Sequence, residues 1–198
     1  MRCVTIAMVL FVISGCNDIT SPQNLGNAYK FGLQSVEKST NPEKQHGSLI
    51  VDFPKVSAEL DTYRISLLRN GGKQDYYSGV RWADFLPVIV QSAMVESLQN
   101  SGLFNVVAAD YANISADYLL QSDIKAFHAD YTKSNPPTIV IKIHLALVEV
   151  KTLKIIKTLT VIREETAKAN DISSIYKSFN VAFISAQKEA LEQIIKTD

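Results

Sequence analysis

The stretch Thr138–Val150 reads Thr-Ile-Val-Ile-Lys-Ile-His-Leu-Ala-Leu-Val-Glu-Val, and it decides the fold class. Successive side chains of a β-strand point to opposite faces, so every second residue shares a face. One face of this stretch carries Lys142 and His144, whereas the other is wholly aliphatic. The aliphatic residues are Ile139, Ile141, Ile143, Leu145 and Leu147. The alternation predicts a long strand that covers a core with one of its faces.

Similar stretches flank this strand on both sides. Tyr118–Tyr131 precedes it across the turn-forming sequence Asn135-Pro136-Pro137, and Leu153–Glu164 follows it after Lys151-Thr152. Long neighbouring strands that are joined by short turns most simply form an antiparallel meander. We therefore expect a three-stranded meander at the centre of the fold.

Two amphipathic helices are expected around the meander, because apolar residues recur at steps of three and four. The first runs from about Ala83 to Ser101, with Asp84 as its N-cap, Pro87 in its first turn and Gly102 as its C-cap. Its apolar stripe comprises Trp82, Phe85, Leu86, Ile89, Val90, Ala93, Met94, Ser97 and Leu98. The second helix runs from about Ser173 to Lys196, and its buried face comprises Ile175, Tyr176, Phe179, Phe183, Ala186, Ala190 and Ile194.

Shorter strands are expected at Tyr29–Val36, Ser48–Phe53 and Leu103–Ala108, and a β-hairpin turns at Asn70-Gly71-Gly72 between Tyr63 and Tyr77. Together these elements predict the α/β (α+β) class. We expect one domain, in which a mixed sheet contains the antiparallel meander and the two principal helices pack on it.

The composition fits one globular domain and excludes several classes of protein. The chain has 198 residues, of which 46% are hydrophobic, and 20 basic side chains balance 20 acidic ones. A neutral chain lacks the basic surplus that drives nucleic-acid binding, so no nucleic-acid partner is expected. Its two cysteines, Cys3 and Cys16, both lie in the first sixteen residues. A disulfide framework in the body of the domain is therefore excluded.

The N-terminus has the pattern of a secretory signal. Arg2 is followed by the apolar run Val4–Val12, which is too short to span a bilayer. The next residues, Ile13-Ser14-Gly15-Cys16, resemble a bacterial lipobox. That resemblance implies cleavage before Cys16 and attachment of lipid to its sulfur. Residues 1–15 are then the lipoprotein signal peptide, residues 16–27 a lipidated flexible tether, and residues 28–198 the domain.

No residue pattern for catalysis or metal binding stands out. The sequence contains no phosphate-binding loop, no nucleophile elbow and no zinc-binding helix motif. If the first meander hairpin is symmetric, His128 lies opposite Ile141 and His144 lies opposite Lys125, on opposite faces. Asp123 and Asp130 are likewise expected on opposite faces. We therefore expect no enzyme, no metal site and no cofactor.

Three lysines, Lys151, Lys154 and Lys157, lie close together near the second meander turn. One interpretation is that they contact anionic lipid headgroups. The interpretation that the sequence favours is an exposed hairpin end, whose lysines discourage pairing with another strand. Glu149 beside the lysines and the neutral total charge support this second interpretation.

The block Tyr76-Tyr77-Ser78-Gly79-Val80-Arg81-Trp82-Ala83-Asp84, followed by Ser101-Gly102-Leu103-Phe104, resembles the ABC-type transport auxiliary lipoproteins of the PqiC type. The resemblance covers about Ala28–Lys196 and includes the order of lipobox, first strand, meander and final helix. It departs at Phe85-Leu86-Pro87, where these proteins often have proline directly after the acidic residue. Trp82 is expected to serve packing, with an interface anchor as the alternative.

The resemblance implies an auxiliary lipoprotein of a Mce-type ABC system that moves lipids between bacterial membranes. Its expected partners are a Mce-domain protein, ABC permease components and the membrane through the lipid anchor, and the resemblance is compatible with a ring of further copies. The expected location is the bacterial envelope with the body in the periplasm, and Asn17 after Cys16 favours the outer membrane over the inner. The alternatives are a lipoprotein of another envelope machine, such as lipopolysaccharide assembly, or a membrane-tethered hydrolase.

Overall fold

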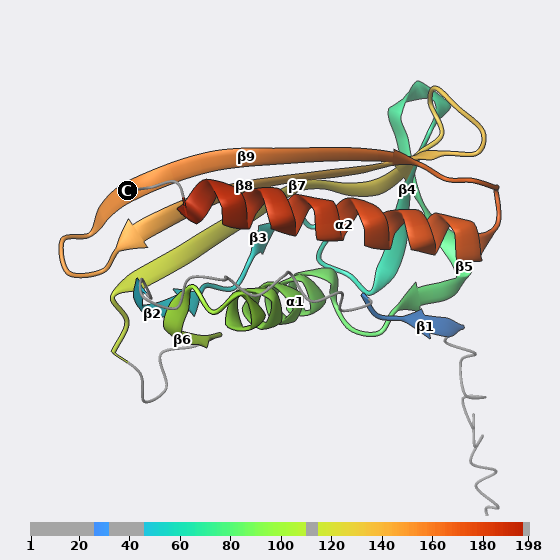
Figure 1. Cartoon of the computed structure of the whole chain (residues 1–198). Helices are drawn as coiled ribbons and strands as arrows, with labels where there is room; N and C mark the ends of the chain where they lie inside the picture. The colour runs from blue at the N-terminus through green and yellow to red at the C-terminus, as the bar shows by residue number, and fades with distance from the viewer. Residues whose placement is uncertain (1–25, 32–45, 110–114, 196–198) are drawn as a thin grey trace, which may run out of the picture.

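A computed structural model describes residues 26–31, 46–109 and 115–195. Within these residues a nine-stranded mixed sheet combines with two α-helices (Figure 1). The α+β class and the packing of both helices on one sheet are thus confirmed. In chain order the elements are β1 Asn27–Tyr29, β2 His46–Val51, β3 Lys55–Val56, β4 Arg64–Arg69, the 3-10 turn Asn70–Gly72, β5 Lys73–Trp82, α1 Leu86–Ser101, β6 Phe104–Ala108, β7 Tyr118–Asp130, β8 Thr138–Glu149, β9 Lys154–Thr166 and α2 Ile172–Ile195.

The meander β7–β8–β9 is antiparallel, as the sequence predicts. The other edge of β7 is shared by three parallel strands, which follow one another along its length. β2 pairs near Tyr118, β3 near Asp123 and β4 near Ala129. The sheet therefore divides beyond β7 into one wing of β2 and β6 and another of β4, β5 and β1.

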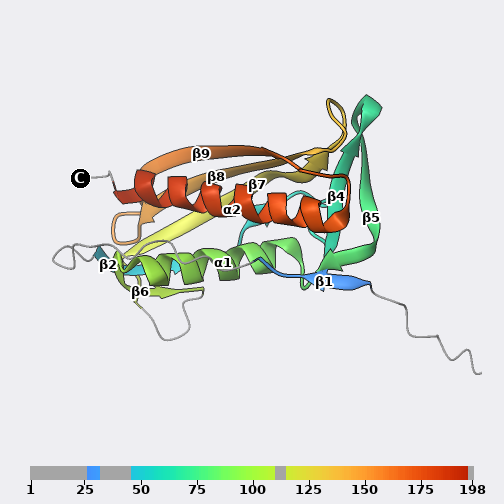
Figure 2. The same cartoon turned by 45° about the vertical axis from the view of Figure 1, so that its right-hand side comes forward.

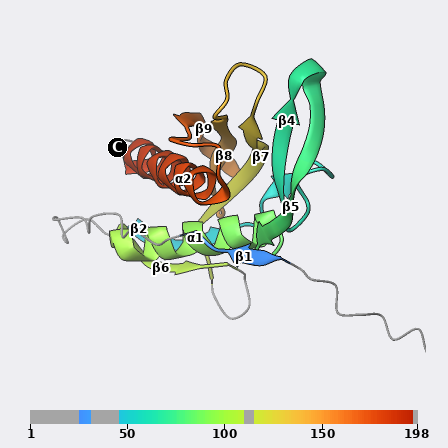
Figure 3. The same cartoon turned by 90° about the vertical axis from the view of Figure 1, so that its right-hand side faces the viewer.

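The sheet curls around the two helices, so that α2 lies between the meander and α1 (Figure 3). Along its length α2 follows β8 and β9, and α1 lies against β2 and β6 (Figures 1 and 2). The aliphatic face of β8 is buried, as expected, with Ile139 and Ile141 fully enclosed. None of the helices within the described ranges is long and apolar enough to cross a bilayer.

The first helix begins later than predicted. α1 starts at Leu86, and its amide donates to the carbonyl of Thr62 at 3.0 Å. The Asp84 carboxylate instead accepts from the amide of Phe85, so the prediction that Asp84 caps the helix is wrong. The physical reason is that the loop before β4 supplies the carbonyl, while Pro87 has no amide to satisfy. Gly102 caps the other end with φ of 67°, as predicted.

Two residues of the predicted apolar stripe of α1 are not buried. Phe85 is 43% exposed and stands edge-on to Tyr63, with ring centroids 5.9 Å apart. Ile89 is half-buried at the rim of the core. Leu86, Val90 and the remaining stripe residues of the helix are buried, so the stripe is narrower than expected.

A β-bulge interrupts β7 between Ile124 and Ala126. The core side chains of β7 follow a two-residue spacing up to Ile124 and resume at Phe127, three residues later. One extra residue in a strand exchanges the faces of all residues beyond it. The strand therefore keeps one buried face along its whole length. Its polar residues beyond the bulge, however, lie on the face opposite to the one that strict alternation predicts.

Two segment boundaries differ from the predicted ones. β1 ends at Tyr29, so the strand predicted from Tyr29 to Val36 is confirmed at Tyr29 and wrong at Lys30 and Phe31, and its remainder lies outside the described residues. Phe31 turns into the core and is 9% exposed, because it contacts Trp82 and Phe183 there. β9 begins at Lys154, and Leu153 belongs to the preceding turn with φ of 57°. The hairpin around Asn70–Gly72 is confirmed.

Candidate functional site

The lipid attachment site predicted at Cys16 lies outside the described residues, so cleavage and lipidation there stay predictions. The chain enters the described domain at Gly26, where an added Cβ would lie 2.2 Å from the carbonyl oxygen of Gly79. β1 then pairs in parallel with the end of β5 that contains Trp82. β1 thus begins at Asn27, one residue before the predicted start of the domain, along an edge of the sheet, and the tether itself stays a prediction.

The Trp-Ala-Asp block ties this entry point to the loop before β4 and to the start of α1. The amide of Trp82 donates to the carbonyl of Tyr63 at 2.7 Å, and the amide of Ala83 donates to the carbonyl of Tyr29 at 2.7 Å. The guanidinium of Arg81 donates to the carbonyl of Trp82 at 3.1 Å. The block thus joins β1, the loop before β4 and the start of α1.

Trp82 serves packing, as expected, because it is 1% exposed. Phe127 and Phe179 both stand edge-on to its indole, with centroids 5.9 Å and 5.3 Å away. Phe127 and Phe179 stack on each other at 5.5 Å and 10°. Each such ring pair stabilises the fold by about 0.5–1.5 kcal/mol beyond the contribution of the apolar area that it buries. The interface-anchor alternative for Trp82 is therefore wrong for this domain.

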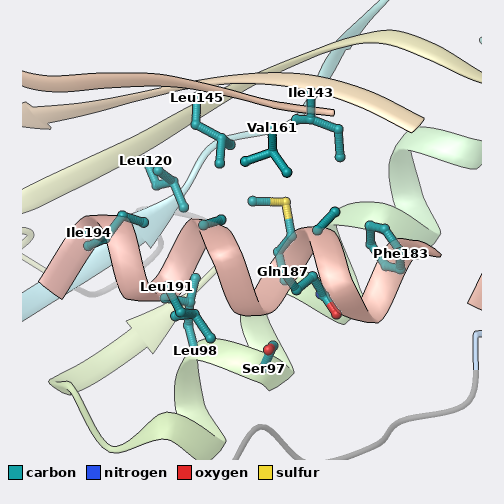
Figure 4. Close-up of a pocket in the computed structure, with 13 residues that line it drawn as sticks. Ser97, Leu98, Leu120, Ile143, Leu145, Val161, Phe183, Gln187, Leu191 and Ile194 are labelled. Carbon is teal, nitrogen blue, oxygen red and sulfur yellow. The ribbon is translucent and has the colours of Figure 1, made fainter. Parts of the chain in front are cut away.

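A second part of the interior is less completely filled. Between α1, α2 and the meander lies an apolar cavity of about 30 Å³ (Figure 4). Small side chains of α2 contribute to its lining, as does Met94 of α1. Its other lining residues are Ser97, Leu98, Leu120, Ile143, Leu145, Val161, Phe183, Ala186, Gln187, Ala190, Leu191 and Ile194.

Two polar atoms in the lining of this cavity have no hydrogen-bond partner. Ser97 Oγ and Gln187 Nε2 are both buried, and both residues lie between the two helices in Figure 4. A buried polar group without a partner is costly, so the helix interface is locally unsatisfied. A cavity of this volume has room for a water molecule but not for an acyl chain. This part of the core is therefore incompletely packed, and it does not provide a lipid-binding pocket.

The histidines lie differently from what the sequence predicts. His128 lies between the bulge and the turn and pairs with Val140, because the hairpin is centred on Ser134 and not on the Ser134–Asn135 link. Beyond the bulge, His144 pairs with Asp123. The two histidines therefore share the outer face of the meander, and the expectation of opposite faces is wrong. Their rungs are four residues apart along β8, which is about 13 Å and beyond the reach of a shared metal ion. In the residues that the structure describes, no group of three or more His, Cys, Asp or Glu could hold a metal.

The predicted opposition of Asp123 and Asp130 is wrong because the bulge lies between them, so that their partners on β8, His144 and Thr138, lie on one face. Asp123 forms an ion pair with Lys125, the extra residue of the bulge. Asp130 accepts from the amide of Thr132 at 2.7 Å, and this bond helps to lower the pKa of its carboxyl against the effect of burial. Each carboxylate is thus engaged locally, and the two do not form a catalytic pair.

Two further pKa shifts have structural causes. Burial lowers the pKa of His128, although the charge of Asp130 opposes this effect. Burial raises the pKa of the Tyr77 hydroxyl far above its ordinary value, and a hydrogen bond of 2.8 Å to the Tyr131 hydroxyl adds to the shift. Tyr131 in turn donates to Asn170 at 2.6 Å. These two hydrogen bonds link β5, the end of β7 and the segment before α2, so their role is to stabilise the fold.

The lysine cluster at the second meander turn is smaller than the sequence suggests. Lys157 points inward and donates to the carbonyl of Gln193 near the end of α2. Lys151 and Lys154 remain exposed at the turn. The exposed aliphatic side chains beside these lysines were not predicted, because the sequence pattern of Leu153–Glu164 indicates an ordinary strand.

Comparisons with known proteins agree with this architecture. The model of the ABC-type transport auxiliary lipoprotein component family matches residues 29–196. Protein XCC0632 from Xanthomonas campestris has a similar fold, with a TM-score of 0.77 at 20% identity over 86% of this chain and 96% of that one. The structure of an uncharacterized protein gives a TM-score of 0.66 at 14% identity over 86% and 99% of the two chains. A search of curated proteins found no match.

The match spans the whole described domain, from β1 to the end of α2, and agrees with the range over which the Trp82 block and the element order indicate a resemblance. The protein therefore belongs to the ABC-type transport auxiliary lipoprotein component family.

Proposed function

We propose that the protein is a lipid-anchored docking subunit of a Mce-type ABC lipid transport system, and that it acts without catalysis. The observation that carries this proposal is family membership over residues 29–196, which makes the chain an auxiliary component of a transporter. The lipobox that ends at Cys16 supplies an anchor directly ahead of the domain. A docking subunit of this kind needs an anchor, a rigid body and a surface for its partner.

The proposed anchor is a diacylglycerol on Cys16 after cleavage before that residue. Two or three acyl chains hold a protein on a bilayer essentially permanently, whereas a single chain does not. The tether then connects the lipid to β1, so that the domain is held in the periplasm, with the outer membrane favoured. β1 is an edge strand next to β5, and in this proposal β9, a different edge strand of the sheet, is available to a partner.

The proposed body is a rigid connector that does not carry lipid. Its hydrophobic core is continuous from Phe31 to Ile194, and the largest side chains in it are fully enclosed. The apolar cavity of about 30 Å³ is too small for an acyl chain. In this proposal the lipid passes through the Mce-domain protein and the ABC permease, while this subunit ties their assembly to the membrane. A ring of several copies is compatible with this role.

The test is co-purification from the bacterium's own envelope. The chain is expressed with its lipobox and a C-terminal tag, and envelopes are extracted with a mild detergent. We expect a Mce-domain protein and permease components to co-purify, and mass photometry of the eluate gives the number of copies. Recovery of lipopolysaccharide-assembly proteins instead would support the alternative envelope machine.

Cys16→Ser is the matched control. It should leave the signal peptide uncleaved, abolish labelling with palmitate and reduce recovery of the partners, because the domain is no longer held at its site. Labelling that survives this substitution would refute the anchor. If the lipidated protein is recovered alone while other envelope complexes survive extraction, and the purified domain hydrolyses an ester or glycan, the hydrolase alternative replaces the docking role.

A further inference from the structure

The turn between β8 and β9 exposes an aliphatic residue in an unusual backbone conformation. Leu153 is 79% exposed, and its φ is 57°. Bulky residues rarely adopt positive φ, because the side chain crowds the backbone, and glycine or asparagine normally occupies such positions. A strained residue that also exposes its apolar side chain is a candidate for function.

The two isoleucines that follow extend this apolar surface. Ile155 is 60% exposed and Ile156 is 40% exposed. The pairing of β8 with β9 shifts between Leu147 and Val148, so Ile156 is an extra residue without a partner in the register. A bulge bends the strand and increases its twist, which turns these side chains away from the core. We name the segment Lys151–Ile156 the hairpin tip.

The charges of the hairpin tip have one sign. Lys151 and Lys154 are exposed, and neither side chain has a hydrogen bond or an ion pair among the described residues. The carboxylate of Glu149 lies just outside the tip, where Glu149 pairs with Lys154 across the ladder and accepts a hydrogen bond from the hydroxyl of Thr152. The tip therefore combines three exposed aliphatic side chains with two lysines, beside a single carboxylate.

This combination favours a lipid surface over a protein partner. Protein interfaces are enriched in aromatic residues and arginine and depleted of lysine. An anionic bilayer attracts lysine side chains, and its acyl boundary accepts aliphatic ones. We propose that the hairpin tip inserts Leu153 and its neighbouring isoleucines into the surface of an anionic bilayer. This proposal goes beyond the docking function and does not depend on which transporter the protein serves.

The position of the hairpin tip gives the proposal a geometric consequence. The tip and β1 lie at opposite ends of the molecule (Figure 1). The ten residues from Asn17 to Gly26 can span at most about 35 Å. The 24 residues of α2 are about 36 Å long, which is comparable. A tether of this reach lets the tip contact the same bilayer that holds the lipid of Cys16.

The test is a fluorescent label on the hairpin tip of the full lipidated protein in vesicles. In the mature chain that we predict, Cys16 is the one native cysteine and its sulfur carries lipid, so Leu153→Cys adds a unique thiol. A polarity-sensitive dye on this thiol should shift to the blue in phosphatidylglycerol vesicles and be quenched by spin-labelled lipid. The anchor holds every variant at the vesicle, so the signal reports the tip alone. Lys133→Cys, in the other turn of the meander, is the matched control without a shift.

Lipid composition and a second pair of variants make the test decisive. With the dye on Ile155→Cys, the additional change Leu153→Gly should reduce the ratio of inserted to free tip, obtained from the quenching, about tenfold, as expected for the loss of one buried leucine side chain. The same change should raise the melting temperature, because glycine adopts the positive φ without strain. A purely structural turn would show the gain in stability without any loss of quenching.

Two outcomes would overturn the proposal. The first is a label on the hairpin tip that shows the same spectrum in phosphatidylglycerol vesicles as in detergent. The second is a label that responds only when a purified transporter component is added, which would make the tip a protein contact. Both outcomes leave co-purification with the transporter unaffected, so failure here is distinguishable from failure of the docking role. A shift that is equal in phosphatidylcholine vesicles would remove the role of the two lysines.

Discussion

The two halves of α2 are stabilised in different ways. In the first half, Phe179 and Phe183 lie in an aromatic cluster with Trp82 and Phe127, and all four are at most 1% exposed. In the second half, small side chains such as Ala190 adjoin the cavity that contains the unpartnered Ser97 hydroxyl. Both halves face the same meander. The comparison shows that packed aromatic rings hold the first half of α2 in place, whereas the second half packs beside a small cavity.

The strongest test of this comparison is truncation on each half of the helix. Phe179→Ala should lower the free energy of unfolding by about 3–5 kcal/mol, because it removes a fully enclosed ring. Leu191→Ala, beside the existing cavity, should cost about 2 kcal/mol, since Met94 can move into the space. Urea unfolding followed by circular dichroism measures both values. Equal losses would show that the two halves are equally well packed.

Enlarging a side chain provides the reverse test. Ala182→Leu adds volume next to the aromatic cluster and should destabilise the fold by about 1–3 kcal/mol, because no space is available there. Ala190→Leu is the same change two turns later, where the cavity can accept part of the new side chain. We expect its unfolding free energy to stay within about 1 kcal/mol of the wild type. If Ala190→Leu lowers the unfolding free energy more than Ala182→Leu does, the cavity cannot accept the larger side chain at position 190.

Removing a hydroxyl tests the unsatisfied polar group itself. Ser97→Ala deletes a buried oxygen that has no partner, and it should raise the unfolding free energy by up to about 1 kcal/mol. Ser101→Ala is the matched control on the same helix. Its hydroxyl donates to the carbonyl of Leu98 at 2.7 Å and accepts from the amide of Leu103 at 3.3 Å. The control should lose about 1 kcal/mol. Equal losses in both variants would indicate that Ser97 has a partner such as water.

The strongly patterned parts of the fold could be predicted from sequence. Alternating aliphatic residues locate β8, and the aromatic and alanine positions of α2 follow its helical period. The glycines at 71 and 72 both adopt positive φ, as the hairpin turn requires. These features depend on local chemistry, which a sequence displays directly.

Features that depend on distant partners could not be predicted. The bulge at Lys125 carries no glycine or proline to mark it, yet this single residue reverses the faces of His128 and Asp130. The carbonyl that receives the first amide of α1 belongs to Thr62, so Asp84 is not needed as a cap. Leu153 resembles the start of a strand, and only the register of β8 and β9 assigns it to the turn.

The smallest expected effect is at the beginning of α2, before its aromatic half. Asp171 accepts from the amide of Ser174 at 2.9 Å and from the Ser174 hydroxyl at 2.7 Å, and these bonds lower the pKa of its carboxyl. A carboxyl with a lowered pKa stabilises the fold above about pH 4, where it ionises in the unfolded chain, and this contribution is lost as pH falls through the lowered value.

Asp171→Ala should therefore weaken the fold slightly at pH 7, and the difference from wild type should vanish under strongly acidic conditions. Amide hydrogen exchange locates the effect, because the first turn of α2 should exchange faster in the variant while amides near Leu191 keep their rates. Ser174→Ala is the matched control, since it keeps the amide that the carboxylate accepts. Faster exchange along the whole helix would contradict the comparison. It would mean that the aromatic cluster does not keep the second half of α2 folded when the Asp171 cap is lost.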